Sequence, residues 1–169
     1  KAGDPVLQPG KYDGGTDEDV IGRLSRFVPI ELEMSQPDCR VAGFAENVLN
    51  RIIRHVRRNY ELKIQRFGTP KGTTEVVVGD KVVKSGRTSG TNSGHVTVVH
   101  ATIKISMGEI GAAMFTDQVL TTRMAQPGDS GSVVLDDNEK VCGLLSAGSD
   151  TVSVFARIQN VCEALSVRF

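Results

Sequence analysis

The seven residues Gln126-Pro127-Gly128-Asp129-Ser130-Gly131-Ser132 decide the interpretation of this 169-residue chain. They place a serine between two glycines, before the apolar run Val133–Leu135. A serine hydroxyl is a poor nucleophile unless the backbone presents it at a tight turn beside a base, and flanking glycines permit that turn. The amides of Gly128, Asp129 and Ser130 are expected on one concave side, where they would hold an oxyanion.

The composition of the whole chain excludes several classes of partner. It carries 20 basic and 20 acidic residues, so the chain has no net positive charge that would attract a polyanion, and no nucleic-acid partner is expected. No apolar run approaches the roughly 20 residues of a membrane span, so no membrane partner is expected. We also expect no cofactor and no metal, because no metal-ligand spacing is present.

The three cysteines are Cys39, Cys142 and Cys162, and an odd number fits a disulfide framework poorly. This count favours a cytoplasmic location. Cys142 and Cys162 are predicted to be buried small hydrophobic residues. A Cys142–Cys162 disulfide is the alternative.

The chain divides into two predicted domains, residues 1–71 and 72–169. The first contains a basic amphipathic helix over residues 38–59, whose first turn Asp38 can cap. Its apolar residues recur every three or four positions and form one stripe: Val41, Phe44, Ala45, Val48, Leu49, Ile52, Ile53 and Val56. Its polar face carries Arg51, Arg54, Arg57 and Arg58.

The second domain alternates short apolar runs with turn signals, which is typical of an all-β barrel. A slip in the alternation near Val99-His100 predicts a β-bulge, and the apolar spacing in Arg157–Leu165 predicts a terminal helix. The six predicted strands are Glu75–Lys84, His95–Ile105, Ala113–Thr121, Ser132–Leu135, Lys140–Ala147 and Thr151–Ala156.

Two motifs resemble one known family. The nucleophile stretch resembles that of the chymotrypsin-like (trypsin-like) serine proteases, and Lys84–Gly90 with Gly94-His95-Val96 resembles a hairpin of their bacterial trypsin-like branch. The resemblance implies a mainly β fold with a complete second chymotrypsin-like barrel, a partial first barrel, one inserted helix and a C-terminal helix. It also implies a serine endopeptidase that acts on peptide or protein substrates.

The resemblance assigns roles to residues around the motif. Ser130 would be the nucleophile, the amides of Gly128 and Ser130 the oxyanion hole, and Asp129 a structural carboxylate. Met124 would lie at the floor of the substrate pocket, although a packed core residue is an equal alternative. The segment Ser146-Ala147-Gly148 would pair with the substrate backbone as an added strand.

The base and the orienting aspartate of the catalytic triad are not identified. The family requires a histidine, an aspartate and a serine, but His55, His95 and His100 are all expected in structural or surface positions. Asp80 and Asp117 likewise resemble positions in the second barrel. Three explanations remain open: segments are missing from this chain, the chain is a stable fragment, or it is a natural pseudoprotease.

Two further functions are therefore alternatives to proteolysis. A pseudoprotease, or a binding module that uses the basic helix, would need no triad. The apolar stripe of that helix is also compatible with association with a missing N-terminal segment or with another chain.

Overall fold

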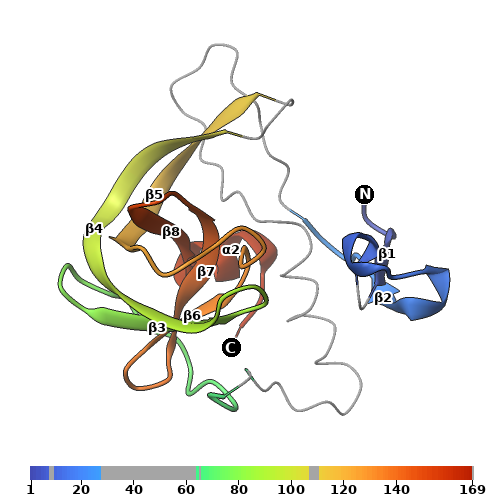
Figure 1. Ribbon diagram of the computed structural model, residues 1–169, viewed down its shortest axis with the longest axis horizontal. Coiled ribbons are helices and arrows are strands. Elements are labelled where there is room, and N and C mark those ends of the chain that lie inside the picture. Colours follow the sequence, from blue (N-terminus) through green and yellow to red (C-terminus); the bar gives the residue numbers. More distant parts are fainter. Residues whose placement is uncertain (8–9, 28–63, 65, 107–110, 169) are drawn as a thin grey trace.

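The computed structural model describes residues 1–7, 10–27, 64, 66–106 and 111–168, and its main body is a closed β-barrel (Figure 1). The strand order around the barrel is β3-β4-β5-β8-β7-β6, and every neighbouring pair is antiparallel. The predicted six-stranded barrel is confirmed. Its strands are β3 (Lys81–Gly86), β4 (Gly90–Ser106), β5 (Ala112–Thr122), β6 (Val133–Asp136), β7 (Val141–Gly148) and β8 (Val152–Arg157).

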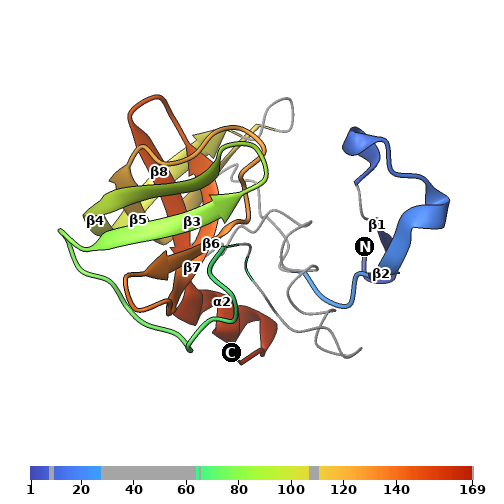
Figure 2. The ribbon, with the colours of Figure 1, turned by 60° about the horizontal axis from the view of Figure 1, so that its bottom comes forward.

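Two apolar clusters stabilise the barrel. One fills its interior, because alternate residues of each strand point inward: Val82, Val96, Val119, Met124, Val134, Cys142, Leu145 and Phe155. The other joins the barrel wall to helix α2 (Ile158–Leu165), which lies at one end of the barrel (Figure 2). Ile158, Val161 and Leu165 form the buried face of α2, so the predicted terminal helix is confirmed.

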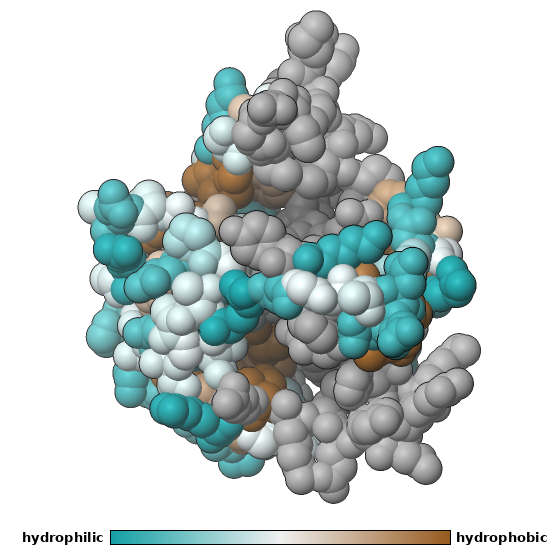
Figure 3. Space-filling view, turned by 45° about the vertical axis from the view of Figure 1, so that its right-hand side comes forward, coloured by the Kyte–Doolittle hydropathy of each residue, from teal (hydrophilic) through white to brown (hydrophobic). Residues whose placement is uncertain are grey.

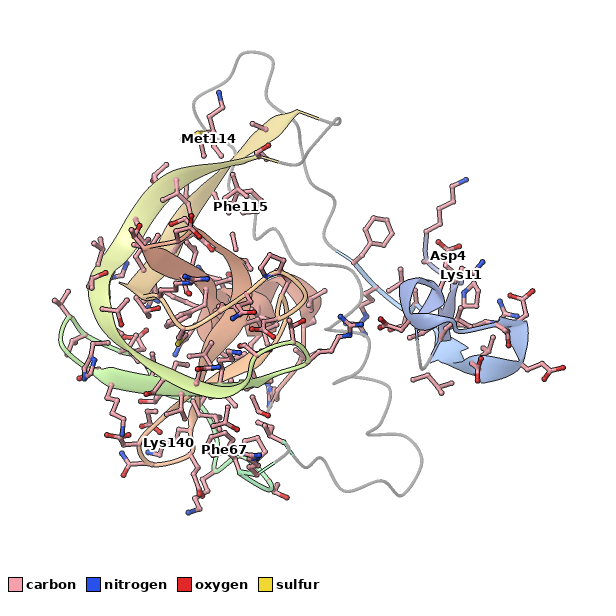
Figure 4. All side chains as sticks on the ribbon, in the orientation of Figure 1. Asp4, Lys11, Phe67, Met114, Phe115 and Lys140 are labelled. Carbon is pink, nitrogen blue, oxygen red and sulfur yellow. The ribbon has the colours of Figure 1, made fainter. Side chains whose placement is uncertain are left out.

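The predicted bulge also lies where the alternation slips. The β4–β5 pairing shifts register between Val96 and Ile103, and His100 adopts a φ of 55°. Beyond this bulge, β4 and β5 continue as a hairpin, paired as far as Ser106 and Ala112. Met114 and Phe115 lie on this part of β5 (Figure 4).

The first barrel strand differs from the prediction at both ends. It begins at Lys81 instead of Glu75, because the Asp80 carboxylate accepts the Val77 amide (2.8 Å) and closes a turn over residues 77–80. This turn leaves Val77 exposed despite its apolar character. At the other end the strand continues to Gly86, which pairs with Gly90. The two predicted strands left residues 85–94 between them, whereas the observed connection is a short turn of residues 87–89, called here the β3–β4 turn.

The N-terminal part forms a small unit apart from the barrel in both views (Figures 1 and 2). Strand β1 (Pro5–Leu7) pairs with β2 (Val20–Arg23), with two short 3-10 helices, η1 (Lys11–Asp13) and η2 (Asp17–Asp19), between them. Arg26 donates a hydrogen bond to the Leu165 carbonyl at 2.7 Å. The predicted helix over residues 38–59, with its arginine face, lies outside the described residues.

The described cysteines are both free thiols, so the alternative of a Cys142–Cys162 disulfide is wrong. Cys142 is buried inside the barrel, as predicted, and burial raises the pKa of its thiol to about 12. Cys162 is only half-buried, because it lies at the border of the buried face of α2.

On one face of the molecule, hydrophilic residues cover most of the coloured surface and hydrophobic residues form several separate patches (Figure 3). Among the residues that the structure describes, no helix combines the length and apolar composition needed to cross a membrane.

Candidate functional site

The nucleophile stretch forms a tight loop between β5 and β6. Gly128 and Gly131 adopt φ values of 95° and 80°, which favour glycine. The Asp129 amide donates to the Gln126 carbonyl at 3.0 Å. The Asp129 carbonyl accepts the Ser132 amide (3.0 Å) and hydroxyl (2.6 Å). These bonds hold the backbone on both sides of Ser130 in one conformation.

Ser130 lies at the exposed tip of this loop. Its hydroxyl has no hydrogen-bond partner within the described ranges, whereas the Ser132 hydroxyl is used to close the loop. The loop therefore presents the first serine to solvent and uses the second for its own structure.

Two backbone amides in the loop are also free. The N–H groups of Gly128 and Ser130 donate to no acceptor in the part of the chain that the structure describes. The Asp129 amide is already used by Gln126, so the expectation of three available amides is wrong, and two remain. They are the same two amides that the family resemblance assigns to an oxyanion hole. Free donors in a rigid loop are the requirement for stabilising an oxyanion.

Asp129 fastens the loop to the barrel. Its carboxylate is fully buried and forms an ion pair with the equally buried Lys84 (Oδ2 to Nζ, 2.8 Å). It also accepts hydrogen bonds from the Thr88 amide (2.8 Å), from the Ser89 amide (3.0 Å) and hydroxyl (2.5 Å), and from the Gln126 amide (3.0 Å).

These donors determine the charge state of Asp129. Burial alone would raise the pKa of its carboxyl, but the hydrogen bonds from Lys84, Ser89 and Gln126 hold that pKa well below the usual range. Asp129 is thus a permanent anion at neutral pH that points into the barrel and away from solvent.

The β3–β4 turn packs closely against the loop at Gly128. A Cβ atom at Gly128 would collide with the Thr88 Oγ1 atom. Glycine is therefore required at this position for two reasons, its positive φ and this close approach.

Lys84, Thr88 and Ser89 were not identified as site residues from the sequence. One signal was present for Lys84, because it alternates with Val82 on β3 and so faces the interior of the barrel. A buried lysine requires an anion nearby, and the nucleophile stretch, which follows 45 residues later along the chain, contains Asp129.

The predicted substrate-binding segment lies at an open edge of β7. Residues 147 and 148 pair with β8, and the Ser146 hydroxyl donates to the Val154 carbonyl at 3.2 Å. β6 pairs with β7 only from Val141 to Leu144, so the other edge of residues 146–148 has no strand partner among the described residues. An extended peptide could pair with such an edge.

Met124 lies inside the barrel. Its side chain is 4% exposed and packs in the interior cluster, and its amide donates to the Ser153 hydroxyl at 3.0 Å. Of the two roles predicted for Met124, this position fits a packed core residue.

The described histidines do not contact Ser130. His95 is exposed on β4. His100 Nδ1 lies 2.6 Å from the Asp117 carboxylate, which also binds Arg157 and Asn160. Asp80 closes its own turn, and His55 lies outside the described residues. The structure thus places Ser130 and the two amides together, without a base among these residues.

The barrel region of the chain is similar to known proteins. Residues 51–165, more than half of the chain, match the family model described as Trypsin. Serine protease 2 of Streptomyces fradiae is 36% identical over 78 residues, which are 46% of this chain and 42% of that protein.

Two crystal structures show the same fold. Cellulomonas bogoriensis chymotrypsin is 27% identical with a TM-score of 0.52, over 58% of this chain and 53% of that one. Thermobifida fusca protease A is 25% identical with a TM-score of 0.53, over 59% of this chain and 53% of that one. The matched region thus spans about half the length of these relatives.

Proposed function

Because the chain belongs to the trypsin family of serine proteases, we propose that it carries the nucleophile and the oxyanion hole of a serine endopeptidase. The observation that carries this proposal is the loop at residues 126–132. It combines an exposed Ser130 hydroxyl with two backbone amides, all without a hydrogen-bond partner among the described residues, in a backbone fixed by a buried ion pair.

The proposed reaction is acyl transfer. Ser130 Oγ attacks the carbonyl carbon of a peptide bond and loses its proton to a general base. The negative charge moves to the carbonyl oxygen, where the amides of Gly128 and Ser130 stabilise it. The base then protonates the leaving amine as the C–N bond breaks, and water hydrolyses the acyl-enzyme.

The general base is proposed to be a histidine other than His95 and His100, because neither of these contacts Ser130. Peptides and proteins are the proposed substrates. The acyl part of the substrate is proposed to run along the open edge of Ser146-Ala147-Gly148.

A pseudoprotease is the second candidate, and the engagement of His100 by Asp117 favours it. A serine site without its base retains only about 10³–10⁴-fold catalysis over water from the oxyanion hole and binding. Such a site would hold peptides without cleaving them.

Labelling with a fluorophosphonate separates the two candidates, because this reagent modifies activated serines. The protease proposal expects one adduct per chain, located at Ser130 by peptide mapping and absent from the Ser130→Ala variant. Ser93→Ala is the matched control, since Ser93 is also exposed and has no side-chain hydrogen bond among the described residues. Peptide binding without any adduct would support the pseudoprotease and refute the protease.

A further inference from the structure

Arg87 lies beside the candidate oxyanion hole, and the reaction proposed above does not use it. It is the first residue of the β3–β4 turn, and its side chain is 54% exposed. Its Nη1 atom lies 3.3 Å from the point that a Cβ atom at Gly128 would occupy. An exposed cation therefore lies next to the amide that would bind the substrate carbonyl oxygen.

The contacts of the loop indicate which side of the substrate Arg87 would face. β7 contacts the loop after Ser130, where the Gly131 amide donates to the Leu145 carbonyl and the Leu145 amide donates to the Ser132 carbonyl. The β3–β4 turn contacts the loop before Ser130, at Gly128 and Asp129. If the acyl part of a peptide runs along β7, the leaving-group part of the peptide extends toward the β3–β4 turn.

Arg87 already binds one carboxylate in this structure. Its Nη2 atom forms an ion pair with Asp13 of the N-terminal unit. The β3–β4 turn points toward that unit in both ribbon views (Figures 1 and 2). Asp13 thus shows that the Arg87 guanidinium is accessible to an acidic group that comes from outside the barrel.

We propose that Arg87 selects an acidic side chain on the leaving-group side of the bound peptide, and that Asp13 competes with that side chain for the guanidinium. This inference rests on the proposed function, since it takes the carbonyl of the substrate to lie at Gly128 and Ser130. The ligand class is a peptide with Asp or Glu shortly after the bond that faces Ser130. Guanidinium and carboxylate form paired, charge-assisted hydrogen bonds.

Peptide binding to the Ser130→Ala chain tests the proposal without turnover. The probes are hexapeptides that differ only in Glu, Gln or Lys at the second residue after the central bond. Affinity is measured by isothermal titration, and binding at the site by the NMR shift of the Gly128 amide. We expect the Glu peptide to bind about 3- to 10-fold more tightly than the Gln peptide, as an exposed but paired contact permits.

Second substitutions in the same background identify the residue responsible. Arg87→Gln should abolish the preference for Glu, whereas Arg87→Lys should retain part of it. Arg123→Gln is the matched control, because Arg123 is also exposed and has no ion pair within the described ranges; it should retain the full preference. Asp13→Asn should strengthen binding of the Glu peptide, because it removes the competing carboxylate.

An equal preference for Glu in the Arg87→Gln variant would overturn the proposal, as would the absence of any shift at Gly128. Fluorophosphonate labelling of the otherwise unchanged chain keeps the two proposals distinct. The unsubstituted chain should be labelled at Ser130 whichever peptide it prefers, so the absence of a charge preference leaves the serine chemistry standing. If Ser130 is not labelled but the Glu peptide is still preferred, only the protease proposal is refuted and the proposal for Arg87 stands.

Discussion

Replacing Lys84 with methionine should destabilise the whole barrel, because Lys84 is the buried partner of Asp129. Methionine has a similar volume, so the change removes the charge with little loss of packing. Removing one partner of a buried ion pair typically costs 3–5 kcal/mol, since an unpaired charge remains.

The remaining contacts place the two single variants at different points in that range. After Lys84→Met, the Asp129 carboxylate still accepts from the Thr88, Ser89 and Gln126 amides and the Ser89 hydroxyl, so we expect about 3 kcal/mol. After Asp129→Asn, the new amide group must face either the Lys84 ammonium or a backbone N–H, so the cost should approach about 5 kcal/mol.

Equilibrium unfolding in urea at pH 7 measures these differences as changes in the unfolding free energy. The Lys84→Met/Asp129→Asn double variant should lose at least about 2 kcal/mol less than the two single losses together. Lys81→Met is the control on the same strand, because Lys81 is half-exposed and lies 3.5 Å from Asp137, and it should lose less than about 1 kcal/mol. Single losses below about 1 kcal/mol that add independently would refute the reasoning.

Three other predictions follow from the same structure. Gly128→Ala should reduce the fluorophosphonate labelling rate by about 10²–10³-fold, because a Cβ atom there displaces an oxyanion donor; an unchanged rate would contradict the assignment. Iodoacetamide should modify Cys162 before Cys142 in the folded protein, as followed by peptide mapping, because deep burial raises the pKa of Cys142 to about 12. Burial alone would raise the pKa of Asp117, but hydrogen bonds from Asn160, His100 and Arg157 lower it below the ordinary value of 3.8. Asp117 therefore stabilises the fold above pH 3.8, and this stabilisation is lost as the pH falls through the lower pKa of the folded state. The melting temperatures of the original chain and the Asp117→Asn variant should therefore converge between pH 5 and about pH 2.5, and a constant difference would contradict this linkage.

The sequence predicted the barrel well because inward and outward residues alternate along its strands. It placed the first strand too early because Val76, Val77 and Val78 are apolar, although Val77 and Val78 lie within a turn that the Asp80 side chain closes. Alternation cannot reveal that local hydrogen bond. The bulge at His100 was predictable, since an extra residue shifts the alternation itself.

The candidate site was predictable only in part. Ser130 and Gly128 lie in a short motif whose glycines indicate a tight turn with positive φ values. Lys84 lies 45 residues before Asp129 along the chain, so their ion pair depends on how β3 and the loop meet in the closed barrel. Without that topology, a lysine in a hairpin motif is expected at the surface.

Barrel closure has a consequence for the order of folding. β3 pairs with β6, so the barrel closes only after β4, β5 and the loop have been synthesised. Contacts between distant segments form late, because the entropy of the intervening chain opposes them. The Lys84–Asp129 pair belongs to this late group. A growing polypeptide therefore carries Ser130 in an unformed loop until the barrel is complete.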